Sequence, residues 1–314
     1  AALRAVARGV CRLSDWSWTP PADSGVRLRM QAANGLNFEL AELDAADGGT
    51  DRLALCLHGF PELNFSWRDQ MAVLSSAGWR VWAPNMRGYG ASDKPEGVDA
   101  YRLDTLAADV AALIDASGAR DVMLVAHDWG AVVAWHFAIK KLRPLVRLVI
   151  MNVPHPMVAQ REGRRWRQLR RSWYIFFFQL PRLPEFGLAQ AGARRVGEAF
   201  AAMAVDKSRF PPEVTDVYRA AALRPGALTA MVNYYRALLR TPDYRAIGDG
   251  RIDTPTLMIW GEEDRALGPW CAQGTEQWVP KLTLHRLPGV SHWVQQEAPA
   301  QVNAILADWL ARAV

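Results

Sequence analysis

The 314-residue sequence predicts an α/β fold with a mostly parallel central sheet, helices on both faces and an inserted helical cap. Three observations predict it. Short, uniformly apolar runs are typical of parallel strands that are buried on both faces. Segments with apolar residues at helical spacing alternate with these runs. The alternation stops after Asn152 and resumes only near Ile252.

The first elements form a predicted hairpin, because residues 26–33 and 36–43 flank Asn34-Gly35, a dipeptide typical of two-residue turns. The later strands are predicted at 53–57, 80–83, 122–126, 145–151, 256–260 and 282–287. Helices are predicted at 103–116, 131–141 and 299–310, the last with a proline at its start. These elements account for the sheet and for the helices on its faces.

The interruption divides the chain into predicted domains. Residues 26–153 and 252–314 form the predicted core, and residues 1–25 form an N-terminal extension. Residues 154–251 form the predicted cap, because prolines separate segments of helical length such as 228–239.

Composition excludes several classes of protein. Thirty-seven basic and 32 acidic residues give a net charge of +5, which is mild, and no nucleic-acid-binding motif accompanies it. Cys11, Cys56 and Cys271 are too far apart for a disulfide framework, which predicts a cytoplasmic protein. No apolar stretch is long enough to span a bilayer. Metal-ligand pairs and phosphate-binding loops are also missing from the sequence, so we expect no metal and no cofactor.

Two basic segments leave a peripheral membrane contact open. Residues 1–15 place apolar side chains at helical spacing beside arginines, which predicts a basic amphipathic helix. The relevant side chains are Leu3, Val6, Val10 and Leu13 with Arg4, Arg8 and Arg12. In the cap, six arginines surround Trp166, namely Arg161, Arg164, Arg165, Arg167, Arg170 and Arg171. Each segment is either an ordinary solvated helix face or a contact for an anionic membrane.

The strongest local signal is Val125-Ala126-His127-Asp128-Trp129-Gly130, at the transition from a buried strand to a helix. This is the shape of a nucleophile elbow, with Asp128 in the nucleophile position. A carboxylate is ionised at neutral pH and needs no base to activate it. Its attack on a saturated carbon gives a stable alkyl ester that water can later cleave, so the predicted substrate has an sp³ electrophile.

Two further residues follow strands in the order that a catalytic triad requires. Asp264 lies in Gly261-Glu262-Glu263-Asp264, and His292 follows the next strand. Asp264 is predicted to orient His292, which would take a proton from the water that attacks the ester. The segment from His58 to Glu62 contains a Gly-x-Pro turn, so the amides of Phe60 and Trp129 are predicted to form an oxyanion hole.

Together these motifs make the chain resemble the soluble epoxide hydrolases of the α/β-hydrolase superfamily. The resemblance covers nearly all of the chain from Val26 onward and rests on residues 58–62, 66–68, 87–92, 127–130, 152–156, 261–264 and 292–293. It implies an α/β-hydrolase fold and conversion of a small-molecule epoxide to a vicinal diol. It also implies that Phe60, Pro61 and Trp129 contact the substrate, and that Tyr174 and Tyr235 of the cap hold and protonate the epoxide oxygen. Tyr234 competes for the second of these roles.

Some residues depart from the pattern and two other functions remain open. Ala126 and Ala131 stand where the family commonly has glycine, and we expect only modest repacking there. Haloalkane dehalogenases and fluoroacetate-cleaving relatives share the aspartate elbow. The haloalkane enzymes typically carry Asn where this chain has Phe60, and the fluoroacetate enzymes carry Arg where it has Trp129. A non-catalytic binding module is the third reading, but such modules have usually lost a triad member.

Overall fold

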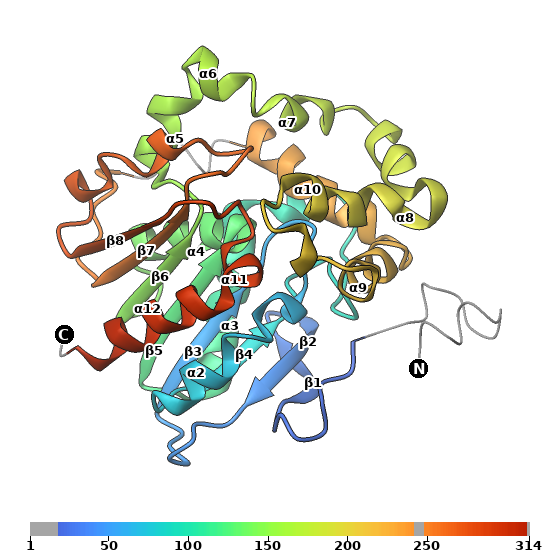
Figure 1. Ribbon diagram of the computed structural model, residues 1–314. Helices are drawn as coiled ribbons and strands as arrows, with labels where there is room; N and C mark the ends of the chain where they lie inside the picture. Colours follow the sequence, from blue (N-terminus) through green and yellow to red (C-terminus); the bar gives the residue numbers. More distant parts are fainter. Residues whose placement is uncertain (1–17, 242–247, 313–314) are drawn as a thin grey trace.

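The computed structural model describes residues 18–241 and 248–312 (Figure 1). Its sheet has eight strands in the order β1-β2-β4-β3-β5-β6-β7-β8. The strands are β1 (Arg27–Ala33), β2 (Leu36–Leu43), β3 (Arg52–Leu57), β4 (Arg80–Pro84), β5 (Asp121–His127), β6 (Arg147–Met151), β7 (Thr256–Gly261) and β8 (Leu282–Leu287). β1 and β2 are antiparallel to their neighbours, and β3 to β8 pair in parallel. The predicted α/β-hydrolase fold is thus confirmed.

The hairpin shows how the sequence specifies local structure. Asn34 and Gly35 have φ values of 49° and 72°. Positive φ at both central residues is the geometry of a type I′ turn, whose twist matches that of the strands it joins. The turn fixes the register, in which Ala33 lies opposite Leu36 and Arg27 opposite Glu42.

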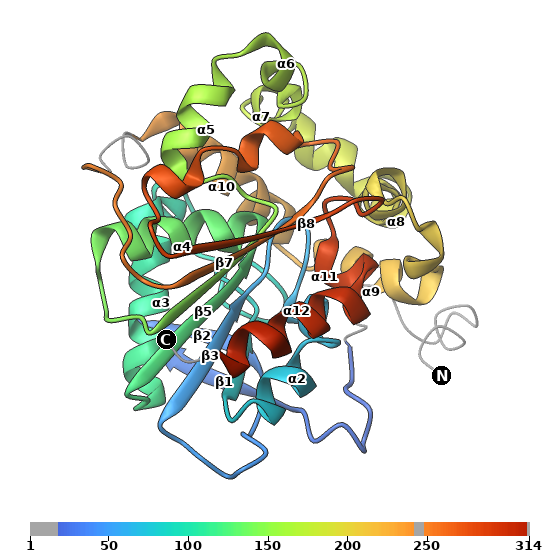
Figure 2. The same cartoon turned by 60° about the vertical axis from the view of Figure 1, so that its left-hand side comes forward.

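Helices cover both faces of the sheet because its strands are apolar on both sides. Leu53, Leu55 and Leu57 of β3 pack with α3 (Leu103–Ser117) and α4 (Asp128–Lys140). Ala54 and Cys56 of the same strand point to the other face. Figures 1 and 2 show α2 (Met71–Ser76) and α12 (Pro299–Ala311) on that second face. The α3 helix ends at Gly118, whose φ of 67° provides a left-handed cap.

Between β6 and β7 the described chain forms helices and no strand, within the segment predicted to be the cap. The helices are α5 (Pro156–Gly163), α6 (Trp166–Leu169), α7 (Trp173–Phe177), α8 (Leu183–Met203), α9 (Pro212–Ala222) and α10 (Ala227–Arg240). A short α11 (Val294–Glu297) precedes α12. Helices α5 to α10 lie over the edge at which the parallel strands end, with α6 and α7 farthest from the sheet (Figure 1).

Two findings concern the predicted membrane contacts. The basic helix predicted near the N-terminus falls on residues 1–17, which lie outside the described residues. Within the described ranges, no helix is both long enough and apolar enough to cross a membrane.

Candidate active site

Asp128 lies at the turn from β5 to α4, where its φ of 45° makes it one of the few non-glycine residues in the left-handed region. Such a conformation persists only where the surroundings enforce it. The surroundings here are unusually close. A Cβ atom at Gly130 would lie 2.2 Å from the carbonyl oxygen of Leu57, and one at Gly59 would lie 2.3 Å from Cβ of Asp128. Glycine at these two positions lets α4 and the 58–62 loop approach the elbow.

The two residues whose amides are predicted to form the oxyanion hole both lie beside Asp128. The amide of Phe60 donates a 2.6 Å hydrogen bond to Oδ1 of Asp128. Trp129 follows Asp128 in the first turn of α4. Phe60 is therefore placed to stabilise charge on Oδ1, the oxygen that would become the carbonyl oxygen of an ester.

His292 lies between two carboxylates. Its Nδ1 is 2.6 Å from Oδ2 of Asp264, and its Nε2 is 3.5 Å from Oδ2 of Asp128. The side chain of His292 is 4% exposed and that of Asp264 is fully buried. The structure therefore brings together the three residues predicted to form the triad, which are separated by up to 164 positions in the sequence.

Asp264 is held by four hydrogen bonds. The amides of Ala266 and Leu267 donate to Oδ1 at 2.7 and 2.9 Å. Oδ2 accepts from Nδ2 of Asn152 at 2.8 Å, in addition to its contact with His292. Asn152 also accepts a bond from the Gly261 amide and has a φ of 48°. The sequence motifs gave Asn152 no role, although an asparagine directly after a strand, before Val-Pro, is a signal for a left-handed turn.

The two carboxylates determine the protonation of the histidine. Burial alone would lower the pKa of His292, but the charges of Asp264 and Asp128 and the hydrogen bonds to them raise it to about 10. Burial acts to raise the pKa of Asp128, yet the hydrogen bond and charge of His292 outweigh it and lower that pKa. At neutral pH the resting site therefore holds an imidazolium between two carboxylates.

A second buried network supports the elbow from behind. Oε2 of Glu62 accepts hydrogen bonds from Nδ1 of His127 and from the Gly59 amide, at 2.6 and 2.9 Å. Nε2 of His127 is 2.9 Å from the carbonyl oxygen of His292. Gln295 and Gln296 donate to the other oxygen of Glu62. Glu62 and His127 belong to the sequence motifs at 58–62 and 127–130, but only the structure shows that they join the nucleophile loop to the histidine loop.

The segment predicted to be the cap lines one side of a cavity of about 710 Å³ that reaches Asp128. Asp128 and Trp129 line it from the core, and Tyr174 of α7 and Tyr235 of α10 line it from the cap. The ring centroids of the two tyrosines are 5.8 Å apart at an angle of 81°. Burial, and then the charge of Asp128, raises the pKa of both hydroxyls, so both are protonated at neutral pH.

The side chains of the two adjacent tyrosines of α10 lie in different surroundings. The hydroxyl of Tyr234 donates a 2.7 Å hydrogen bond to the carbonyl oxygen of Arg87 and is fully buried. Tyr235 lines the cavity and packs edge-on against Trp129, with centroids 4.9 Å apart. Burial is the main effect that raises the pKa of Tyr235, and a hydrogen bond with the Trp129 side chain partly opposes it.

Phe60 and Pro61, which are predicted to contact the substrate together with Trp129, do not line the cavity as Trp129 does. The side chains that line the cavity include Trp129, but neither Phe60 nor Pro61 is among them. The ring of Phe60 packs edge-on against Phe178 and Tyr235, at 5.5 and 5.3 Å between centroids, and Pro61 is buried. Phe60 therefore positions Tyr235 with its ring and Asp128 with its amide.

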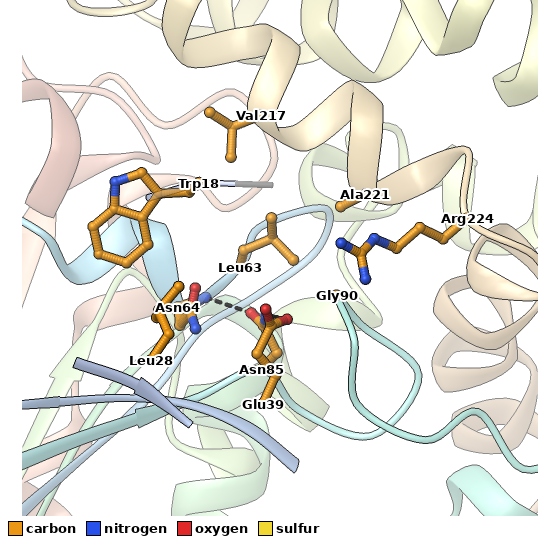
Figure 3. A pocket seen from close by; sticks show the side chains of 10 residues that line it. All are labelled: Trp18, Leu28, Glu39, Leu63, Asn64, Asn85, Gly90, Val217, Ala221 and Arg224. Carbon is orange, nitrogen blue, oxygen red and sulfur yellow. Dashed lines mark hydrogen bonds between the residues drawn. The ribbon is translucent and has the colours of Figure 1, made fainter. Parts of the chain in front are cut away.

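Another cavity, of about 20 Å³, lies apart from the nucleophile and has room for about one water molecule (Figure 3). Its walls include Trp18, Asn64 and Arg224. The backbone amide of Asn64 donates a 2.7 Å hydrogen bond to Oδ1 of Asn85 (Figure 3). Across the described residues, no three His, Cys, Asp or Glu side chains are grouped so as to hold a metal ion. The large cavity is the one whose walls carry the reactive groups.

Comparison with known proteins agrees with this architecture. Residues 55–299 match the family described as alpha/beta hydrolase fold. The AB hydrolase superfamily protein YfhM of Bacillus subtilis is 38% identical over 292 residues, covering 91% of this chain and 98% of the relative. Epoxide hydrolase 4 of Mus musculus is 35% identical over 281 residues, covering 87% and 76%.

A solved structure extends the likeness to three dimensions. The crystal structure of Bacillus megaterium epoxide hydrolase in complex with an inhibitor is 29% identical, with a TM-score of 0.81 over 90% of this chain and all of that one. The fold, the matched span and these relatives lead to one conclusion. The chain belongs to the α/β-hydrolase fold family and, within it, to the epoxide hydrolases.

Proposed function

We propose that this enzyme hydrolyses epoxides to vicinal diols through an alkyl ester on Asp128. One observation carries the proposal: a single, mostly apolar cavity contains an ionised carboxylate on one wall and two protonated tyrosine hydroxyls on the other. An epoxide needs a nucleophile at carbon and O–H donors at oxygen, and the cavity supplies both. The epoxide hydrolases among the relatives support the same substrate class.

In the first step, Oδ2 of Asp128 attacks an epoxide carbon and the C–O bond of the ring breaks. The electron pair of that bond moves to the epoxide oxygen, which takes a proton from Tyr174 or Tyr235. The Phe60 amide stabilises Oδ1 as the carboxylate becomes an ester. No base is needed, because Asp128 is already ionised.

The proton of His292 links the two steps. Esterification removes the charge of Asp128, so His292 keeps only one of the two carboxylates that raise its pKa, and that pKa falls. His292 can then give up its proton, which restores the tyrosine hydroxyl and leaves a neutral imidazole. This fall in pKa explains how His292, which is protonated in the resting enzyme, becomes a base for the hydrolysis of the ester.

In the second step, neutral His292, oriented by Asp264, takes a proton from water, and the hydroxide attacks the ester carbonyl. The acyl C–O bond breaks, the leaving alkoxide takes the proton of the hydroxyl that was added to the acyl carbon, and the diol leaves. Asp128 is again a carboxylate and His292 again an imidazolium. The sum is one epoxide plus one water giving one diol.

The same proposal assigns the cap and the location of the protein. Residues 154–251 serve as a cap that supplies the tyrosine wall, and residues 26–153 and 252–314 serve as the core that supplies the charged wall. Cys56 and Cys271 are buried free thiols, which supports work in the cytoplasm or at its membranes.

Trapping the ester tests the mechanism. His292→Gln should permit the first step but block the second, so incubation with styrene oxide should add the mass of one substrate molecule to the intact protein. The matched control is the Asp128→Asn, His292→Gln double variant, which should add none. The absence of an adduct on His292→Gln, when an isotherm shows that it binds styrene oxide, would contradict the ester.

A label experiment tests the same step in the unmodified enzyme. In a single turnover in ¹⁸O-water with enzyme in excess, the first diol should carry an unlabelled oxygen from Asp128. One ¹⁸O atom in every molecule of that first diol would show that water attacks the epoxide directly. Halide release from haloalkanes in the absence of diol formation would move the assignment to dehalogenation.

A further inference from the structure

The outer edge of the cap concentrates the positive charge of the protein. Residues 161–186, here called the cap rim, run from the end of α5 through α6 and α7 into the start of α8. They contain seven arginines and two glutamates, a balance of +5 that equals the net charge of the whole chain. The remaining 30 basic and 30 acidic residues cancel. The charge is therefore a local property of the cap rim.

The cap rim also concentrates exposed aromatic side chains. Trp166, Trp173, Phe176 and Phe186 are 53% to 71% exposed, and no other Trp, Phe or Tyr among residues 18–241 and 248–312 is exposed. Leu169, Leu180 and Leu183 in the same segment are exposed as well. Large exposed apolar groups gathered in one segment mark an interaction surface, whereas isolated ones are ordinary.

The arginines of the cap rim divide into two groups. Arg161, Arg165 and Arg167 lie within 3.1, 3.6 and 2.7 Å of the carboxylate of Glu162, and Arg171 donates to the carbonyl oxygen of Asp264. Arg164, Arg170 and Arg182 make no ion pair with any described residue. Three guanidinium groups are thus left to face an external anion.

The cavity above Asp128 opens at this surface. Arg164, Leu169 and Phe176 of the cap rim, and Leu239 of α10, line the cavity and are themselves exposed, so part of the mouth of the cavity lies on the cap rim. In Figures 1 and 2, α6 and α7 lie at the extreme of the molecule that is farthest from the sheet. A flat partner can therefore reach the cap rim without touching the core.

We propose that the cap rim docks on the surface of an anionic phospholipid bilayer, with the mouth of the cavity turned toward the membrane. Arginines would bind lipid phosphates while tryptophan, phenylalanine and leucine enter the interfacial layer, the combination used by interfacial helices. A second copy of this chain fits less well, because its cap rim carries the same charge. A nucleic acid would pair the arginines but leave the leucines in water.

Docking would give the cavity a supply of apolar substrate. Epoxides of low solubility partition into bilayers, and the mouth at Leu169 and Phe176 would meet them there. This consequence rests on the proposed epoxide hydrolysis, whereas the docking itself does not. A binding measurement therefore tests the docking whether or not the hydrolysis is correct.

The experiment is co-sedimentation of the full chain with sucrose-loaded vesicles of phosphatidylcholine containing about 30 mol% phosphatidylglycerol, at about 0.1 M salt. We expect binding to these vesicles and at least about tenfold weaker binding to phosphatidylcholine alone. Two combined variants test the cap rim. The triple variant Trp166→Ala, Trp173→Ala, Phe186→Ala and the double variant Arg170→Gln, Arg182→Gln should each reduce the apparent partition coefficient on the order of tenfold. None of these residues lines the cavity.

Control variants remove charged and exposed apolar groups elsewhere. Arg120→Gln, Arg143→Gln removes two charges that pair with Asp51 and Asp115, and Met30→Ala, Val205→Ala removes exposed apolar groups outside the cap rim. Both controls should bind vesicles as the wild type does. Unchanged binding by the cap-rim variants, with unchanged thermal melts, would overturn the proposal. Dimerisation through the cap rim without binding to vesicles would overturn it as well.

Discussion

The two walls of the active-site cavity are built by different physical means. On the core wall, hydrogen bonds fix every reactive group: Asp264 accepts four, and the Phe60 amide holds Asp128. On the cap wall, the rings of Tyr174 and Tyr235 pack against each other and against Phe178, at 4.9 to 6.0 Å between centroids. The reactive groups of the core wall are charged, and those of the cap wall are neutral hydroxyls.

This difference follows from the cost of desolvation. A buried carboxylate or imidazolium without partners is strongly destabilising, so the core wall must supply a hydrogen bond for nearly every lone pair. A phenol is mostly apolar, and ring packing alone can orient it. The core wall should therefore tolerate almost no change, whereas the cap wall should lose activity in graded steps without losing the fold.

Removing the nucleophile should produce the largest effect. Asp128→Asn is nearly isosteric but cannot form the ester, so diol formation should fall on the order of 10⁴-fold or more. Steady-state kinetics measures the loss, and circular dichroism checks the fold. An activity within about tenfold of wild type, with deamidation of the introduced side chain excluded by mass spectrometry, would contradict the covalent role of the core wall.

Changing the cap wall should produce graded effects. Tyr174→Phe and Tyr235→Phe should each slow the opening of the epoxide by a factor on the order of 10 or more, as expected for loss of a donor at about 2 kcal/mol. The double variant should nearly abolish diol formation. Tyr234→Phe is the matched control, since its hydroxyl bonds to Arg87 and does not reach the cavity. Near-normal diol formation by the double variant would remove both tyrosines from the mechanism.

Removing a support of the core wall should have a smaller effect. Asn152→Ala deletes one of the four bonds to Asp264 and leaves that carboxylate underpaired. Hydrolysis of the ester should slow about tenfold, in line with about 1–3 kcal/mol for a buried unpaired acceptor, while its formation changes little. Pre-steady-state quenching separates the two rates. Equal slowing of both steps would show that Asn152 acts on the whole site and not through Asp264 and His292.

The protonation state of the His292 ring tests the charges of the core wall directly, although we expect little change in activity with it. The imidazole should remain protonated at pH 8 in the wild type, since its pKa is raised to about 10. It should become neutral there in Asp128→Asn, which lacks one of the two carboxylates. Nitrogen-15 chemical shifts of the ring distinguish the forms. A neutral ring in the wild type at pH 7 would contradict the proton relay.

The same titration has a consequence for stability. A folded-state pKa above the unfolded value means that protonated His292 stabilises the fold below about pH 6.5, and that this stabilisation is lost as pH rises through about 10. The difference in free energy of unfolding between wild type and His292→Gln should therefore shrink between pH 7 and 10. A difference that grows over this range would reverse the assigned sign.

The sequence by itself determined the elements and the order of the chemistry. Apolar runs predicted the five strands β3 to β7, the segments that flank Asn34-Gly35 predicted the hairpin of β1 and β2, and the strand-to-helix transition at Asp128 predicted the elbow. These features are local, because backbone periodicity and turn geometry depend on a few neighbouring residues. The order Asp128, Asp264, His292 then followed from the positions at which parallel strands end.

Only the tertiary structure decided which side chains face one another. Adjacent Tyr234 and Tyr235 point differently because successive residues on a helix are rotated by about 100°, and packing of α10 sets that rotation. Asn152 meets Asp264 across 112 positions, and the ring of Phe60 packs against Tyr235. Such contacts depend on the burial of whole helices against the sheet, which no local pattern specifies.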